Sequence, residues 1–205
     1  MNIKFGCTPF YIEAVKELEE YVDFYKIASY ELLWLDLIRA AAEMKKELIL
    51  SSGMANLEEI DEAVKISESV SGIKPTVLHC VSNYPAKISQ VNLSAIKTIK
   101  DRLGCKVGWS DHSVSKEVLI TSILRWKSEM IEFHLDLDGK GEEFGAGHCW
   151  LPDDIEEVIR FINIADACSG DGIKMPTDEE TNERLWRADP DDGLRPLKEI
   201  RDETK

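Results

Sequence analysis

The chain has 205 residues, of which 43 % are hydrophobic, and this is enough for one sizeable core of ordinary domain size. Its 39 acidic and 25 basic side chains give a formal net charge of −14. This acidic balance argues against nucleic-acid binding, which depends on basic side chains that neutralise phosphates.

The sequence also indicates the cellular compartment in which the protein works. No apolar run approaches the roughly 20 residues that a membrane helix needs, and the first residues lack the layout of a signal peptide. The five cysteines are scattered without a CxxC pair. This spacing excludes a disulfide framework and a zinc ribbon, and it indicates a reducing, cytoplasmic setting.

Short apolar segments alternate with longer amphipathic ones along most of the chain. Strands are predicted at 3–7, 24–28, 47–51, 76–80, 106–109 and 130–135, and helices at 12–21, 34–44, 57–69, 93–103, 116–126 and 153–168. This alternation is typical of βαβ units with a parallel sheet. Six strands fit either part of an eight-stranded barrel or a doubly wound open sheet, and the pattern alone does not choose.

Two helix starts carry recognisable caps. Asn56 precedes the helix at 57–69, with Glu59 at its third position, which is the pattern of a capping box. Ser113 or Ser115 is expected to cap the helix at 116–126. From about Gly170 the apolar periodicity fades, so we expect one α/β domain at 1–169. Residues 170–205 are then a C-terminal extension with a short helix near 181–186.

Polar side chains follow every predicted strand at its carboxyl end, where parallel α/β folds collect their chemistry. Serine and threonine hydroxyls together with Lys26 suit a phosphate or carboxylate, which needs several donors and a cation. His112 and His134 end adjacent strands and suit a divalent metal with open coordination positions. His79 and His148 are expected to have packing roles.

Six motifs at these strand ends occur in one familiar order. They are Thr8-Pro9-Phe10, Lys26-Ile27-Ala28-Ser29-Tyr30-Glu31, Ser51-Ser52-Gly53-Met54-Ala55, His79-Cys80-Val81-Ser82-Asn83-Tyr84-Pro85, Gly108-Trp109-Ser110-Asp111-His112 and Ile131-Glu132-Phe133-His134. With them the chain resembles the sialic acid synthase (N-acetylneuraminate synthase) family from residue 3 to about 185. The resemblance implies a partial (β/α)8 TIM-type barrel with strands 3 to 8. The family's first two βα units and its C-terminal antifreeze-like domain would then be missing.

The resemblance also implies a reaction. In the family, C3 of phosphoenolpyruvate adds to the aldehyde of an N-acylhexosamine, water attacks C2, and phosphate leaves to give a nonulosonic acid. The sugar would be of the N-acetylmannosamine type, free or as its 6-phosphate. A divalent metal, Mn²⁺ or alternatively Mg²⁺ or Co²⁺, would polarise the aldehyde.

The motifs assign an expected role to each matching residue. The resemblance implies a phosphoenolpyruvate cradle of Thr8, Lys26, Ser29, Ser51, Ser82 and Ser110. It implies His112 and His134 as metal ligands that also serve catalysis, and Glu31 as the catalytic carboxylate for proton transfer. Tyr84 would form a wall of the sugar pocket, and Glu143 would stand in for a sugar-binding aspartate.

Two other functions remain open at this point. Because a lysine-bearing strand of the family would be missing, the chain could be a non-catalytic remnant or subunit that binds the anion or a partner chain. Another phosphoenolpyruvate-condensing barrel that makes a keto-deoxy sugar acid is the weaker alternative. An incomplete barrel would expose sheet edges, so a homo-oligomer or a partner chain is expected.

Overall fold

The computed structural model describes residues 3–203. Two compact units divide the chain, one at Met1–Asn163 and the other at Ile164–Lys205. No described helix is long and apolar enough to cross a membrane.

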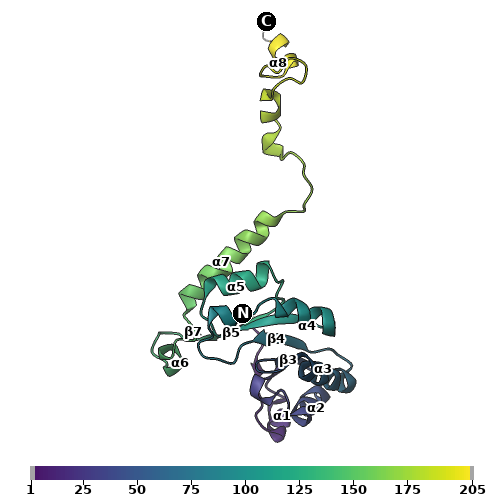
Figure 1. Ribbon diagram of the computed structural model, residues 1–205, viewed down its shortest axis with the longest axis vertical. Coiled ribbons are helices and arrows are strands. Elements are labelled where there is room, and N and C mark those ends of the chain that lie inside the picture. The colour runs from purple at the N-terminus through teal and green to yellow at the C-terminus, as the bar shows by residue number, and fades with distance from the viewer. Residues whose placement is uncertain (1–2, 204–205) are drawn as a thin grey trace. The chain divides into compact units, whose positions relative to one another are not determined.

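The first unit is a parallel sheet in which every strand pairs with its neighbour in sequence (Figure 1). Its strands are β1 (Gly6–Cys7), β2 (Phe24–Ile27), β3 (Glu47–Ser51), β4 (Thr76–Cys80), β5 (Val107–Asp111), β6 (Ile131–Leu135) and β7 (Cys149–Trp150). The connecting helices are α1 (Ile12–Leu18), α2 (Leu35–Glu43), α3 (Leu57–Ser71), α4 (Ala95–Leu103), α5 (Lys116–Leu124) and α6 (Glu142–Gly145). The helix α7 (Pro152–Ser169) follows β7, and the division between the two units falls within it.

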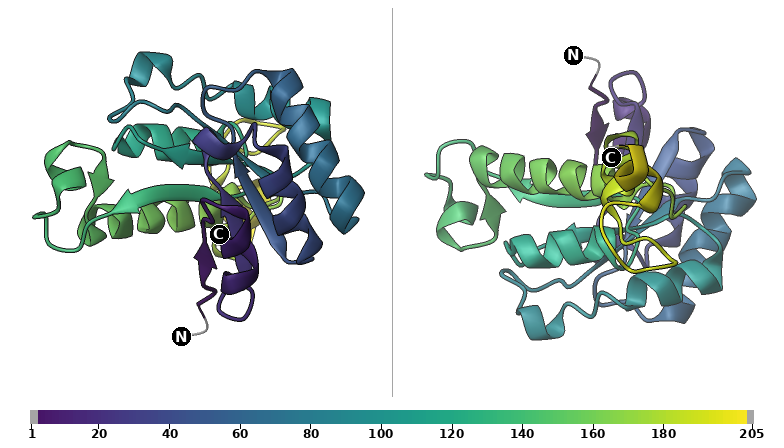
Figure 2. Two further views of the ribbon diagram at one scale, coloured as in Figure 1. Left: turned by 90° about the horizontal axis from the view of Figure 1, so that it is seen from below. Right: turned by 90° about the horizontal axis from the view of Figure 1, so that it is seen from above.

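This strand order decides between the two architectures that the sequence left open. A doubly wound sheet reverses its strand order at a switch point, whereas a barrel adds each strand beside the previous one. The observed order β1-β2-β3-β4-β5-β6-β7 contains no reversal, and the sheet curls with its helices alternating along it (Figure 2). The fold is therefore a partial (β/α) barrel, as the resemblance implied.

Apolar side chains between sheet and helices form one core. Tyr25 and Ile27 on β2, Leu50 on β3 and Trp109 on β5 have no exposed surface, and Leu37 on α2 packs against the same cluster. Both predicted caps are present. Asn56 and Glu59 form a capping box at α3, and the Ser115 hydroxyl accepts a hydrogen bond from the Val118 backbone N–H at α5.

The prediction of six strands was wrong by one. The structure adds β7, which pairs in parallel with β6 so that His134 lies opposite Cys149 and Leu135 opposite Trp150. A strand of two residues shows no alternation of apolar and polar side chains, so its sequence carries no periodic signal. Its pairing comes from the tertiary fold, because β6 offers it a free edge.

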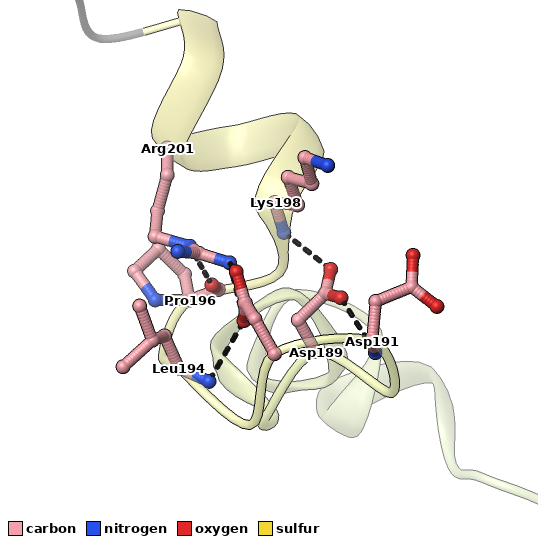
Figure 3. A network of polar contacts seen from close by, with 7 residues as sticks. Asp189, Asp191, Leu194, Pro196, Lys198 and Arg201 are labelled. Atoms are coloured by element: carbon pink, nitrogen blue, oxygen red, sulfur yellow. Dashed lines mark hydrogen bonds and ion pairs between the residues drawn. The ribbon is translucent and has the colours of Figure 1, made fainter.

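The second unit contains two 3₁₀ turns, η3 (Asp178–Glu180) and η4 (Glu183–Trp186), and the helix α8 (Lys198–Glu203). The turns lie where a short helix was expected, but α8 was not predicted. Figure 3 shows the polar contacts that order this region. The Asp189 carboxylate accepts from the backbone N–H groups of Asp191 and Lys198, and the Asp192 carboxylate binds the Arg201 guanidinium.

Candidate active site

A cavity of about 370 Å³ opens at the carboxyl ends of β2 to β6. Its lining is Lys26, Ala28, Ser29, Tyr30, Ser51, Tyr84, Ser110, His112, Glu132, Phe133 and His134. Seven of the eleven predicted site residues are therefore neighbours in one cavity. A second cavity of about 330 Å³, between α3, β4 and α4, contains none of them.

The one lysine that lines the described part of this cavity, Lys26, is paired with a carboxylate from a distant strand. Lys26 Nζ on β2 lies 3.1 Å from Glu132 Oε1 on β6, and the Ser110 hydroxyl on β5 donates to the same oxygen at 2.8 Å. The Lys26 side chain is only 12 % exposed, so its ammonium group is fixed in place. A bound anion would have to share or displace Glu132 from these two donors.

The end of β3 approaches the cavity closely. The Gly53 backbone N–H donates to Ser29 Oγ at 3.1 Å, and Ser29 Oγ lies 3.2 Å from Cys80 Sγ. A Cβ at Gly53 would collide with the Ser82 hydroxyl and lie only 2.9 Å from Ser29 Oγ. Glycine is therefore needed here for the two serine hydroxyls to approach the backbone.

His112 is oriented by the turn that follows β5. One Asp111 carboxylate oxygen accepts from Ser113 and the other from the Val114 backbone N–H, while Val114 adopts a left-handed φ of 52°. A β-branched residue is strained in that conformation, and the buried Asp111 side chain holds it there.

The His112 ring is poised to use its second nitrogen. Its Nδ1 lies 2.7 Å from the Val81 carbonyl oxygen, which fixes Nδ1–H as the donor and leaves Nε2 with a free lone pair. Burial lowers the pKa of His112, and the neighbouring His134 lowers it further. The neutral imidazole favoured in this way is the form that ligates metals.

His134 lies in a cluster of metal-ligating side chains. One ligand atom from each of His134, Glu143, His148 and Cys149 lies within 4.8 Å of the other three. The His134 ring centroid is 5.5 Å from that of His112 and 5.1 Å from that of His148. The hydrogen bond from His134 Nδ1 to Glu143 Oε2, 3.0 Å long, lowers the pKa of Glu143. These residues have the donor atoms that a divalent cation needs.

Four predicted residues lie outside the lining of this cavity. Thr8 and Ser82 are half-buried and follow β1 and β4 in the chain, and Glu143 meets the site through His134. Glu31 lies in the 3₁₀ turn η1 (Ser29–Glu31), and its buried Oε2 has no hydrogen-bond partner among the described residues. Their expected roles stay predictions.

Sequence reasoning missed three residues of this site. Glu132 was named only as part of a motif. It lies two residues before His134 on the same strand, and this spacing is a signal that both side chains point to the same face of the sheet. His148 was expected to pack in a loop and Cys149 received no role. The structure places both beside His134, because β7 pairs with β6.

Comparison with known proteins decides the family. Residues 1–174 match the NeuB family. The chain belongs to this family. This confirms the resemblance to sialic acid synthases that the six motifs indicated.

Individual relatives are a legionaminic acid synthase and a pseudaminic acid synthase. The chain is 33 % identical to the N,N′-diacetyllegionaminic acid synthase of Campylobacter jejuni over 87 % of its own length and 54 % of that protein. It is 38 % identical to the pseudaminic acid synthase of Helicobacter pylori over 64 % of its own length and 38 % of that protein. The chain thus spans about half the length of the curated relatives it matches.

A solved structure shows the same fold. The N-acetylneuraminic acid synthetase of Leptospira borgpetersenii, crystallised with citrate, is 32 % identical and superposes with a TM-score of 0.77. The match covers 89 % of this chain and 64 % of that one. The fold of this chain is therefore shared with part of a related synthetase.

Proposed function

We propose that this chain carries the anion and metal half of a nonulosonic acid synthase site. The reaction joins phosphoenolpyruvate to an N-acylhexosamine of the N-acetylmannosamine type. The observation that supports it is the meeting of Lys26, three serines, His112 and His134 in one cavity. A buried ammonium group beside several hydroxyl donors is what a carboxylate and a phosphate require.

The chain's residues divide the work as follows. Lys26, Ser29, Ser51 and Ser110 bind the enol phosphate, with Thr8 and Ser82 at the margin of the cradle, and Tyr84 packs against the sugar. C3 of the enol forms a bond to the aldehyde carbon, and water adds at C2 before phosphate leaves. Glu31, whose buried carboxylate oxygen has no hydrogen-bond partner within residues 3–203, is the proposed site of proton transfer.

His112 and His134 are the proposed metal ligands, and Glu143 contacts the same site through His134. A divalent cation, for which the resemblance implies Mn²⁺, supplies Lewis-acid polarisation of the sugar aldehyde when bound. His112 supports this role through its fixed tautomer, and the Tyr84 ring contacts the His112 ring at a tilt of 38° with centroids 4.2 Å apart.

Phosphate release from the 205-residue chain tests this function. We expect release only when phosphoenolpyruvate, N-acetylmannosamine or its 6-phosphate, and a divalent metal are all present. His134→Ala should reduce the rate to background, while circular dichroism shows the fold retained, because His134 is partly exposed at a strand end. Release that ignores the sugar, or full activity in His134→Ala, would contradict the proposal.

A second candidate function follows from the length of the chain relative to its relatives. A subunit or remnant that spans half of a synthase could bind the anion without turning it over. Calorimetry with phosphoenolpyruvate and Mn²⁺ separates the two. Binding without phosphate release favours the non-catalytic function.

A further inference from the structure

We propose that His148 and Cys149 complete the metal site at His134, and that this site prefers Zn²⁺ or Co²⁺ to Mn²⁺ or Mg²⁺. The inference rests on the proposed function only in placing a metal at this edge of the barrel. It goes beyond that function by assigning Glu143, His148 and Cys149 as the ligands that join His134, with His112 outside this four-residue set, and by naming the class of cation.

The spacing of the ligand atoms supports this assignment. Glu143 Oε2 lies 3.0 Å from His134 Nδ1, 3.9 Å from His148 Nε2 and 3.8 Å from Cys149 Sγ. Tetrahedral zinc bonds of about 2.0 to 2.3 Å place neighbouring ligand atoms roughly 3.3 to 3.8 Å apart. The distances from Glu143 Oε2 to His134 Nδ1 and to Cys149 Sγ match these edges within a few tenths of an ångström. The distance to His148 Nε2 is longer, and all four ligand atoms lie within 4.8 Å of one another, so side-chain rotations would bring them around one cation.

The backbone holds these side chains rigidly. His134 on β6 and Cys149 on β7 are direct partners in the parallel register, so their positions are fixed by strand pairing. Glu143 lies in α6, between these two strands in the chain, and a single helical turn carries it to His134. Sites built on paired strands hold their geometry better than sites on free loops.

The buried state of His148 is a second, independent observation. Its side chain is only 9 % exposed, and its Nδ1 is buried without a hydrogen-bond partner among the described residues. Its Nε2 faces Glu143 at a distance too long for a hydrogen bond. Burying an imidazole that leaves a nitrogen unsatisfied costs free energy, and coordination of a cation would offset that cost.

The donor set selects the cation. Two imidazoles, a thiol sulfur and one carboxylate oxygen form a site of mixed nitrogen and sulfur character. Thiolate and imidazole ligands favour Zn²⁺ and Co²⁺, whereas Mg²⁺ and Mn²⁺ prefer oxygen ligands. A site made only of His112 and His134 has no sulfur ligand and would show no such preference. The measured preference of the site for Zn²⁺ and Co²⁺ therefore shows whether Cys149 is a ligand.

Titration of the metal-free 205-residue chain with Co²⁺ alone, without substrates, tests the proposal. We expect a thiolate-to-cobalt charge-transfer band in the near ultraviolet. Cys149→Ser should abolish this band, and Cys105→Ser, at another buried cysteine, should leave it unchanged. His148→Ala should weaken Co²⁺ binding about 100-fold or more, since loss of residues that only orient a ligand already costs about 10- to 100-fold.

Competition calorimetry then measures the preference of the site for Zn²⁺ over Mn²⁺. We expect Zn²⁺ to displace Mn²⁺ from the wild-type chain, and we expect most of this preference to disappear in Cys149→Ser. An absent charge-transfer band, or a band retained in Cys149→Ser, would overturn the inference. These readouts need no turnover. If the chain shows the charge-transfer band but releases no phosphate, the metal-site inference stands and the proposed function is wrong. If the chain releases phosphate but shows no band, the proposed function stands and the inference is wrong.

Discussion

At the scale of single residues, the Lys26 ammonium group is the positive charge that an anion in the cavity would meet. It is the only lysine or arginine among the described lining residues, and it is held by Glu132 from another strand. Because Ser110 donates to the same carboxylate, three side chains from three strands form one chain of polar contacts. An incoming anion therefore meets donors that are already positioned.

Lys26→Met should weaken phosphoenolpyruvate binding by about 10- to 100-fold. A hydrogen bond to a charged group contributes roughly 1.5 to 3 kcal/mol, and methionine keeps the apolar stem without the cation. Calorimetry measures the dissociation constant. Lys65→Met, which removes an exposed lysine on α3, is the matched control and should bind as the wild type does. Equal affinity of Lys26→Met and wild type would remove Lys26 from the cradle.

His79 gives a pH-dependent stability that is separate from the site. Its ring is partly buried on β4 with Nε2 hydrogen-bonded to the Val91 carbonyl oxygen, and desolvation lowers its pKa below the ordinary 6.5. The folded state then binds fewer protons than the unfolded state. The stability that the neutral ring contributes is thus present above about pH 6.5 and lost as the pH falls through the lowered value.

His79→Gln should reduce this pH dependence, because glutamine can still donate to Val91 but does not titrate. Urea unfolding at pH 7.5 and at pH 5.5 provides the comparison. We expect the free energy of unfolding to drop less on acidification in the variant than in the wild type. An identical drop in both proteins would show that His79 does not contribute.

At the scale of elements, the Asp111 side chain joins β5 to β7. Its carboxylate is fully buried and accepts four hydrogen bonds, from the Trp109 and Trp150 indoles, the Ser113 hydroxyl and the Val114 backbone. Trp150 follows Cys149 on β7, so this carboxylate fixes the strand that carries the proposed extra ligand. The same side chain also orients the turn that holds His112.

Asp111→Asn should destabilise the fold by about 2 to 6 kcal/mol. The amide nitrogen replaces one acceptor oxygen, so two donors lose their partner, and each buried unsatisfied group costs roughly 1 to 3 kcal/mol. Urea denaturation measures the change. Asp101→Asn on the exposed surface of α4 is the control and should alter stability by less than about 0.5 kcal/mol. Wild-type stability of Asp111→Asn would contradict this account of the carboxylate.

At the scale of the whole molecule, the sheet of the described residues has two outer strands, β1 and β7. Unpaired edge strands offer a template for another chain unless they are covered or charged. Apolar side chains are exposed next to β1, with Phe5 58 % and Phe10 62 % exposed. This combination favours association with a second copy or a partner chain.

We therefore expect the purified chain to associate in a concentration-dependent manner, and Phe5→Glu to shift it toward the monomer. Analytical ultracentrifugation measures the distribution. Ile88→Glu is the matched control, because Ile88 is similarly exposed but lies in the 3₁₀ turn η2 (Ile88–Gln90) after β4. A wild-type chain that stays monomeric at every concentration would contradict this expectation.

The sequence by itself determined the alternation of strands and helices, the α3 capping box and the edge where the polar residues gather. These features depend on periodicity and on neighbours along the chain, which any sequence displays directly. It also placed Lys26, Ser110, His112 and His134 at strand ends, and the carboxyl ends of parallel strands necessarily meet.

Only the tertiary structure decided the rest. The pairing of Lys26 with Glu132, the two-residue strand β7 and the approach of His148 and Cys149 to His134 join residues that lie far apart in the chain or carry no periodic signal. Such contacts depend on strand register and on the curl of the sheet. Both are set by how the whole core packs, so no local pattern encodes them.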